Sequence, residues 1–268
     1  MKYFIESISS KHNPRVKNLL HLQKHSERVK QNMFIIEGIK EIEKVLLADY
    51  VIDSLYYCPE IIPKDEICKH LNPDFKGRVF EITSEIFNKV AYRKDSGGLL
   101  LLAKQKEHVL DKIDFETNPI LLVIEGVEKP GNIGAIYRTA DAAGISAIII
   151  CDPGTDIYNP NTIRASLGCV FTIQTAITTG KEAIDWLKKR NIKIYTSYLK
   201  AAIPYYQADF KQASAIVMGT EATGVTDRWL KASDLNIIIP MHGKADSMNV
   251  STAAAVIIFE AIRQRDSK

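Results

Sequence analysis

Two patterns of hydrophobic and polar positions follow one another along this chain of 268 residues. Near the amino terminus, short apolar runs alternate with stretches of helical spacing. They predict strands at residues 34–36, 54–57 and 79–82, and helices at residues 39–47 and 84–91. The order of these elements predicts a small alternating α/β unit that closes near residues 99–103.

Beyond a charged passage at residues 104–108, the apolar runs lose their alternation, which is typical of parallel strands buried on both faces. Such runs occupy residues 120–124, 147–151, 194–197, 216–218 and 237–239. With helical segments between them, they predict an open parallel sheet that binds ligands at the carboxyl ends of its strands. We therefore expect one domain at residues 1–105, a linker at 106–117 and a second domain at 118–268.

Composition narrows the class of protein only slightly. Hydrophobic residues at 46% and charged residues at 25% are ordinary for a folded soluble protein. A net charge of +3 does not by itself indicate nucleic-acid binding. Basic residues do gather near the amino terminus, where Arg15, Lys17 and Lys24 form a candidate phosphate-contacting surface, unless they are only the solvated face of a helix.

Metal and membrane chemistry are not indicated. Cys58, Cys68, Cys151 and Cys169 form no C-x-x-C pair and no histidine cluster accompanies them, so we expect reduced thiols and no structural metal. No stretch approaches the roughly 18 apolar residues of a membrane span, and the first residues do not resemble a signal peptide. We expect a cytoplasmic protein without a membrane partner.

The loop after the first strand of the second domain carries the strongest signal. Residues 130–134, Pro-Gly-Asn-Ile-Gly, open a helix, and we expect Asn132 to be its N-cap. Free N–H groups at a helix start attract anions. Arg138 follows amid small apolar residues, where a buried guanidinium would need a phosphate or carboxylate partner. The alternative to an anion-binding site is a purely structural one, in which a capped helix packs its alanines on the sheet.

Three later loops add polar groups at strand ends. A helix begun by Asn159-Pro160 contains Arg164, a second candidate phosphate contact. Residues 219–224, Gly-Thr-Glu-Ala-Thr-Gly, form a polar turn that alone is also consistent with a plain turn. Ser247 and Asn249 precede a long helix that is apolar on two sides, which predicts contact with a partner chain.

Three segments together resemble the motifs of the SpoU, or TrmH-like, branch of the SPOUT RNA methyltransferases. They are Pro-Gly-Asn-Ile-Gly-x-x-x-Arg at 130–138, Gly-Thr-Glu-x-x-Gly at 219–224, and Ile-Pro-Met followed by Ser-Met-Asn-Val-Ser between 239 and 251. Residues 13–17 and 34–38 resemble a substrate-binding domain of L30e-like fold. The resemblance implies a carboxyl-terminal SPOUT domain with a deep trefoil knot, S-adenosylmethionine as cofactor, and a homodimer.

The resemblance also implies roles for individual residues in methylation of a ribose 2'-hydroxyl. The implied catalytic residues are Arg138, Asn132, Glu221, Ser247 and Asn249. The implied cofactor-binding residues are Gly219, Thr220, Ile239, Met241 and Met248. Arg15, Lys17, Lys24 and Arg164 are the expected RNA contacts. Lys129 and Ala222 depart from residues common in the family, which makes loop geometry and substrate preference less certain.

Other functions stay open at this point. The separate amino-terminal domain favours ribosomal over transfer RNA as the substrate. A relative that modifies a base, or an RNA-binding protein that has lost catalysis, would share the same plan. An unrelated nucleotide-binding protein would need a phosphate loop such as G-x-x-x-x-G-K-[ST], and the sequence contains none.

Overall fold

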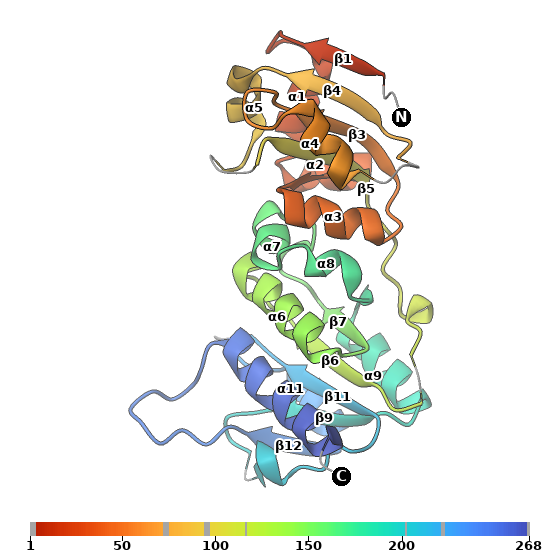
Figure 1. The fold of residues 1–268 in the computed structure, drawn as a ribbon. Helices are drawn as coiled ribbons and strands as arrows, with labels where there is room; N and C mark the ends of the chain where they lie inside the picture. The colour runs from red at the N-terminus through yellow and green to blue at the C-terminus, as the bar shows by residue number, and fades with distance from the viewer. Residues whose placement is uncertain are drawn as a thin grey trace. The chain divides into compact units, whose positions relative to one another are not determined.

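The computed structural model describes residues 4–71, 75–93, 97–115, 117–201, 203–220 and 223–266. Contacts divide the chain into two units, each built around one sheet (Figure 1). The first contains the described residues up to Glu107 together with Asp156–Thr172, and the second contains His108–Thr155 and the residues from Ile173 onward. The domain limits expected from the sequence stay a prediction. Among the described residues, no helix is long and apolar enough to cross a membrane.

The first unit has a mixed five-stranded sheet in the order β1-β4-β3-β5-β2. Its strands are β1 (Ile5–Ile8), β2 (Met33–Glu37), β3 (Ile52–Tyr57), β4 (Arg78–Ile82) and β5 (Leu99–Lys104). Its helices before the linker are α1 (Pro14–His21), α2 (His25–Gln31), α3 (Ile39–Leu47), α4 (Lys64–His70) and α5 (Ser84–Val90). Strand β5 runs antiparallel to β2 and β3, and the other pairings are parallel. Leu19 of α1 and Phe87 of α5 join one buried cluster with Phe80 of β4.

Two short helices from later in the chain, α7 (Pro160–Ala165) and α8 (Cys169–Thr172), complete the first unit. Buried aromatic rings attach them to it. The ring of Tyr158 lies 4.2 Å from that of Phe34 between centroids, and the ring of Phe171 lies 5.7 Å from Phe34 and 5.4 Å from Tyr50. This aromatic cluster buries apolar surface that the rest of the first unit would otherwise expose.

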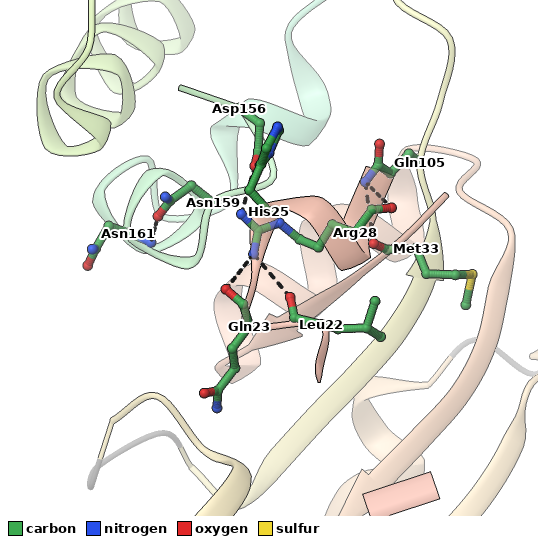
Figure 2. Close-up of polar contacts among 9 residues, drawn as sticks. All are labelled: Leu22, Gln23, His25, Arg28, Met33, Gln105, Asp156, Asn159 and Asn161. Atoms are coloured by element: carbon green, nitrogen blue, oxygen red, sulfur yellow. Dashed lines mark hydrogen bonds and ion pairs between the residues drawn. The ribbon is translucent and has the colours of Figure 1, made fainter. Parts of the chain in front are cut away.

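A buried arginine fastens the same segment (Figure 2). Arg28 is only 2% exposed, and its Nη1 donates to the carbonyl oxygens of Leu22 and Gln23 at 3.0 and 2.8 Å. Its Nη2 donates to the Asp156 carboxylate at 2.7 Å, and His25 Nδ1 lies 2.5 Å from the same carboxylate oxygen. One guanidinium therefore binds the end of α1 and the residue that begins the inserted segment.

The second unit has a seven-stranded sheet in the order β10-β12-β9-β11-β6-β7-β8, with every pairing parallel. Its strands are β6 (Ile120–Glu125), β7 (Ala147–Cys151), β8 (Thr175–Thr178), β9 (Lys193–Ser197), β10 (Ile203–Pro204), β11 (Ser214–Met218) and β12 (Leu235–Ile238). Its helices are α6 (Pro130–Ala143), α9 (Gly180–Lys189), α10 (Asp227–Ala232) and α11 (Val250–Asp266), with 3-10 turns at Leu110–Lys112 and Tyr205–Gln207. The expected parallel sheet is confirmed, and the knot stays a prediction.

Helices cover both faces of this sheet, which explains why its strands β6, β7 and β11 are buried at every position. On one face, Val123 packs with Trp186 of α9 and Trp229 of α10. On the other, α6 and α11 lie side by side (Figure 1). Helix α11 buries Ile257 and Ile258 there, but Phe259 on its outer side is 48% exposed.

Candidate active site

A cavity of about 370 Å³ opens where strands β12, β9 and β11 end. These strands are neighbours in the sheet, so their carboxyl-terminal loops meet at one edge. Ser197 ends β9, Met218 ends β11, and Ile239 follows β12, and all three line the cavity. The volume lies within the roughly 300 to 1,000 Å³ of small-molecule sites, and the position is where parallel sheets bind ligands.

The residues expected to bind the cofactor come together here. Gly219, Thr220, Ile239, Met241 and Met248 all line the cavity, as does Ser247. Thr220 and Gly224 exchange backbone hydrogen bonds of 3.0 and 3.1 Å, which folds the turn after β11 back on itself. A Cβ atom at Gly219 would collide with the backbone of Gly224, so only glycine permits this turn.

The cavity suits a ligand that is partly apolar and partly zwitterionic. Met218, Met241 and Val250 supply apolar surface, and Lys200 and Asp227 are the charged residues among those that line it. A lysine and an aspartate match a carboxylate and an ammonium group better than they match a phosphate. S-adenosylmethionine, with its adenosine and amino-acid ends, fits this set of residues.

Two predicted catalytic residues are joined beside the cavity. Asn249 Nδ2 donates to Asn132 Oδ1 at 3.1 Å, and the neighbours of Asn249 on both sides line the cavity. Asn249 Oδ1 also accepts from the backbone N–H of Ser251 at 3.0 Å and from its hydroxyl at 2.6 Å. The expectation that Asn132 is the N-cap of α6 is wrong, because the helix begins at Pro130 with Lys129 as N-cap. Proline favours the first helical position, where no N–H is required.

Arg138 is exposed, so the expectation of a buried guanidinium is also wrong. The buried face of α6 is formed by Ile133, Ile136, Tyr137 and Ala140, and Arg138 points away from it because each helical residue turns by about 100°. Among the residues that the structure describes, the Arg138 side chain has neither an ion-pair nor a hydrogen-bond partner, and it does not line the cavity. Glu221 lies outside the described residues.

The four expected RNA contacts all belong to the first unit. Lys17 and Lys24 are exposed at α1 and just before α2. Arg15 is half-buried, with its guanidinium carbon 4.5 Å from the centroid of the Phe80 ring. Arg164 is exposed on α7. The structure thus gathers these residues in one unit, although Arg164 comes from far along the chain.

A buried acid that the sequence reasoning missed supports the cavity. Glu125 ends β6 and is 4% exposed, and its carboxylate accepts from the Thr226 backbone N–H at 2.7 Å and from the Thr226 hydroxyl at 2.9 Å. Thr226 lies two residues after Gly224, at the end of the turn that begins at Gly219, and it is the N-cap of α10. The sequence did offer a signal for Glu125, because it is the one acid at the end of the otherwise apolar strand β6. The loop after β9, which includes Lys200, was missed too.

Burial holds the thiols of Cys58 and Cys151 in their protonated form. Cys58, Cys151 and Cys169 are buried and form no disulfide. Burial raises the pKa of the Cys58 thiol to about 11, helped by its hydrogen bond to Glu60, and burial also raises the pKa of Cys151. Within the described ranges, no group of histidine, cysteine or acidic residues could hold a metal ion.

A parallel sheet with a cavity at its strand ends, bordered by the three motifs, defines the class of protein. Residues 119–259 match the SpoU rRNA Methylase family, and residues 13–101 match the MRM3-like substrate binding domain. The chain belongs to the SpoU rRNA methylase family, and the resemblance inferred from its sequence is confirmed.

Relatives match nearly the whole chain. The 23S rRNA (guanosine(2553)-2'-O)-methyltransferase RlmP of Bacillus subtilis (strain 168) is 29% identical over 255 residues, which are 95% of this chain and 98% of the relative. A crystal structure of an RNA 2'-O ribose methyltransferase has a TM-score of 0.84 at 35% identity, covering 97% of this chain and 99% of its own. The AdoMet-bound rRNA methyltransferase of Sinorhizobium meliloti has a TM-score of 0.88 at 27% identity, covering 97% and 98%.

Proposed function

We propose that this protein, an RNA 2'-O-ribose methyltransferase that uses S-adenosylmethionine, acts on 23S ribosomal RNA. The observation that carries the proposal is the cavity at the ends of β9, β11 and β12, lined by every residue that the family motifs predict for the cofactor. When bound, the cofactor supplies the methyl group on its sulfonium. The named 23S rRNA enzyme that matches along nearly the whole chain supports the choice of RNA.

Arg138 is proposed to hold the phosphate beside the target ribose and to stabilise negative charge that develops on the 2'-oxygen. A guanidinium has a pKa above about 12 and does not act as a base in proteins. Its planar fork instead donates two parallel hydrogen bonds to a phosphate. The exposure of Arg138 and its lack of a partner among the described residues leave it available for that contact.

Asn132 and Asn249 are proposed to position the target ribose at the wall of the cavity, and Ser247 and Glu221 are proposed as further catalytic residues. The support for the pair is its 3.1 Å hydrogen bond, which fixes the first turn of α6 against the start of α11. Ser247 is exposed and lines the cavity, where its hydroxyl is accessible to a substrate.

A homodimer through the outer side of α11 belongs to this proposal. Phe259 is 48% exposed there, and Val256 and Ile262 beside it are half-buried. A large exposed aromatic between two aliphatic side chains is typical of an interface. Sedimentation equilibrium should give twice the mass of the chain for the wild type, and Phe259→Glu should give the mass of one chain.

The experiment that tests the reaction incubates the purified protein with radiolabelled S-adenosylmethionine and separate pools of ribosomal and transfer RNA from cells that lack the enzyme. Nuclease digestion and mass spectrometry then locate the label. We expect label on one ribose of 23S rRNA. Label in tRNA would replace the proposed substrate, label on a base would reject the 2'-O assignment, and cofactor binding without transfer to either pool would favour a binding role.

A matched pair of variants tests the role of Arg138. Arg138→Lys keeps the charge but loses the fork, so we expect kcat to fall about 100-fold or more, as when one donor to a developing oxyanion is removed. Lys188→Ala, an exposed cation on α9, should leave kcat unchanged. Retention of most of the turnover in Arg138→Lys would refute the bidentate role.

A further inference from the structure

Lys44 of α3 lies directly against the sulfur of Cys169, the first residue of α8. Both residues belong to the first unit, in which α3 and α8 are neighbours (Figure 1). Lys44 Nζ donates to Cys169 Sγ at 2.8 Å. An N–H···O hydrogen bond is typically about 2.9 to 3.0 Å long, and sulfur is larger than oxygen. The nitrogen and the sulfur are therefore closer than a hydrogen bond to sulfur requires, at a separation that one bridging oxygen atom can span.

Gly168 explains how the two side chains come so close. Its φ of +79° lies in the left-handed region that favours glycine. A Cβ atom at Gly168 would lie 3.0 Å from Glu41 Cα and 3.2 Å from Lys44 Cβ. The backbone just before Cys169 thus packs on α3 and on the aliphatic part of Lys44, with no side chain between them. The short contact is a product of tertiary packing, since the two residues are 125 positions apart in the sequence.

The surroundings of Cys169 differ from those of the other described thiols. Cys169 is 4% exposed and forms no disulfide. Cys58 instead donates to the Glu60 carboxylate, and burial raises the pKa of Cys151. An ammonium group beside a thiol favours the thiolate, which is the form that peroxide oxidises. Among the described cysteines, Cys169 is therefore the one whose neighbour promotes oxidation.

We propose that hydrogen peroxide joins Lys44 to Cys169 through a single oxygen atom, as an N–O–S bridge. In the balanced step, one thiol and one ammonium group react with two molecules of hydrogen peroxide. The S–H bond and two N–H bonds break, an S–O and an N–O bond form, and three water molecules and one proton are released. Sulfur and nitrogen each lose two electrons, and the two peroxide molecules accept all four. Two molecules of dithiothreitol return the four electrons and leave the thiol, the amine and one water molecule.

The bridge fastens the inserted helices to α3. A covalent link between residues 125 positions apart restricts the unfolded chain, so we expect the Tm to rise by about 5 to 20 °C. The low exposure of Cys169 admits a small oxidant such as hydrogen peroxide and excludes a bulky one such as glutathione disulfide. The proposal depends neither on the cofactor nor on RNA.

The first test is mass spectrometry of the full-length protein after treatment with hydrogen peroxide. Digestion should yield one linked pair of peptides that contain Lys44 and Cys169, with the summed mass of the two peptides plus one oxygen and minus two hydrogens. Lys44→Arg keeps the positive charge but lacks the amine, and should give no link. Lys40→Arg changes an exposed lysine of the same helix and is the matched control, which should form the link as the wild type does.

The second test is calorimetry of the same proteins before and after oxidation. The Tm should rise in the wild type and in Lys40→Arg, and dithiothreitol should return it to the starting value. It should not rise in Lys44→Arg. A Lys44 side chain that only donates a hydrogen bond would not make the Tm depend on peroxide and on a reductant.

Three results would overturn the proposal. One is sulfinic acid at Cys169 in a wild-type protein whose Lys44 is unmodified. Another is a linked pair of peptides that lacks the additional oxygen, because its mass would show a direct S–N bond. The third is an equal rise of the Tm on oxidation in the wild type and in Lys44→Arg.

Discussion

Glu125 offers the sharpest test of how the fold prepares its cofactor cavity. Its buried carboxylate accepts two hydrogen bonds from Thr226, which lies two residues after Gly224 in the turn that lines the cavity. Hydrogen bonds to a charged acceptor are worth about 1.5 to 3 kcal/mol each. Because Thr226 is exposed, water replaces part of what is lost, and we expect Glu125→Ala to cost about 2 to 4 kcal/mol of unfolding free energy.

The milder variants separate the two hydrogen bonds. Glu125→Gln keeps one acceptor oxygen and should cost about 1 to 2 kcal/mol, and Thr226→Val removes only the hydroxyl and should cost a similar amount. In the double variant these costs should not add, and a coupling of about 1 kcal/mol is expected. Thr226→Ser keeps the hydroxyl and is the matched control, with stability close to that of the wild type.

The assay combines urea unfolding with calorimetric titration of S-adenosylmethionine. If Glu125 holds the turn in its binding conformation, Glu125→Gln should raise the Kd for S-adenosylmethionine about 5- to 30-fold. This corresponds to about 1 to 2 kcal/mol of binding free energy, which the variant loses because the turn must become ordered on binding. Two results would refute this reasoning. One is additive costs in the double variant, and the other is an unchanged Kd in a Glu125→Ala protein that has lost stability.

Three further predictions concern other contacts. Asn249→Ala should lower the unfolding free energy by about 1 to 2 kcal/mol, because it removes the cap of α11 and the hydrogen bond to Asn132. In urea unfolding, the double variant Asn132→Ala/Asn249→Ala should lose less than the sum of the two single losses. Arg28→Met should lower the unfolding free energy by about 3 to 5 kcal/mol, because it leaves two carbonyl oxygens unpaired and the Asp156 carboxylate with His25 as its remaining side-chain contact. Hydrogen exchange should accelerate in α7, and unchanged exchange there would contradict the assigned contact. Burial raises the Cys58 pKa from 9.0 to about 11, so between pH 9 and 10 the thiol ionises mainly in the unfolded protein. The unfolding free energy of the wild type should therefore fall by about 1 kcal/mol relative to that of Cys58→Ala over this range. A difference between the two proteins that does not change with pH would count against the raised pKa.

Local patterns predicted many elements closely. Helix α3 and strand β7 have the expected bounds, because their apolar spacing and their flanking residues agree. Strands β1, β8 and β10 were missed, since each is at most four residues long and only partly buried. So short an amphipathic segment carries too few residues to show a period.

Side-chain environments were harder to predict than elements. The alanines around Arg138 suggested a buried surface, but Ala142 is exposed and Ala135 half-buried, because small residues also occur on the solvent side of helices. The partners of Glu125 and Arg28 lie 101 and 128 residues away along the chain. No local pattern records contacts of that range, so the motifs indicated the cavity but not the residues that hold it.

Because helices α7 and α8 belong to the first unit, that unit cannot complete its fold until they have been synthesised. The first unit lacks Tyr158 and Phe171 of its aromatic cluster until the ribosome has passed residue 172, which is 65 residues beyond Glu107 (172 minus 107). At about 5 to 20 residues per second, this leaves Phe34 and Tyr50 without those partners for about 3 to 13 s. During that interval strands β6 and β7 are already made. A nascent chain of this protein therefore exposes an unfinished apolar surface while its catalytic sheet begins to form, and that interval is when a chaperone would bind it.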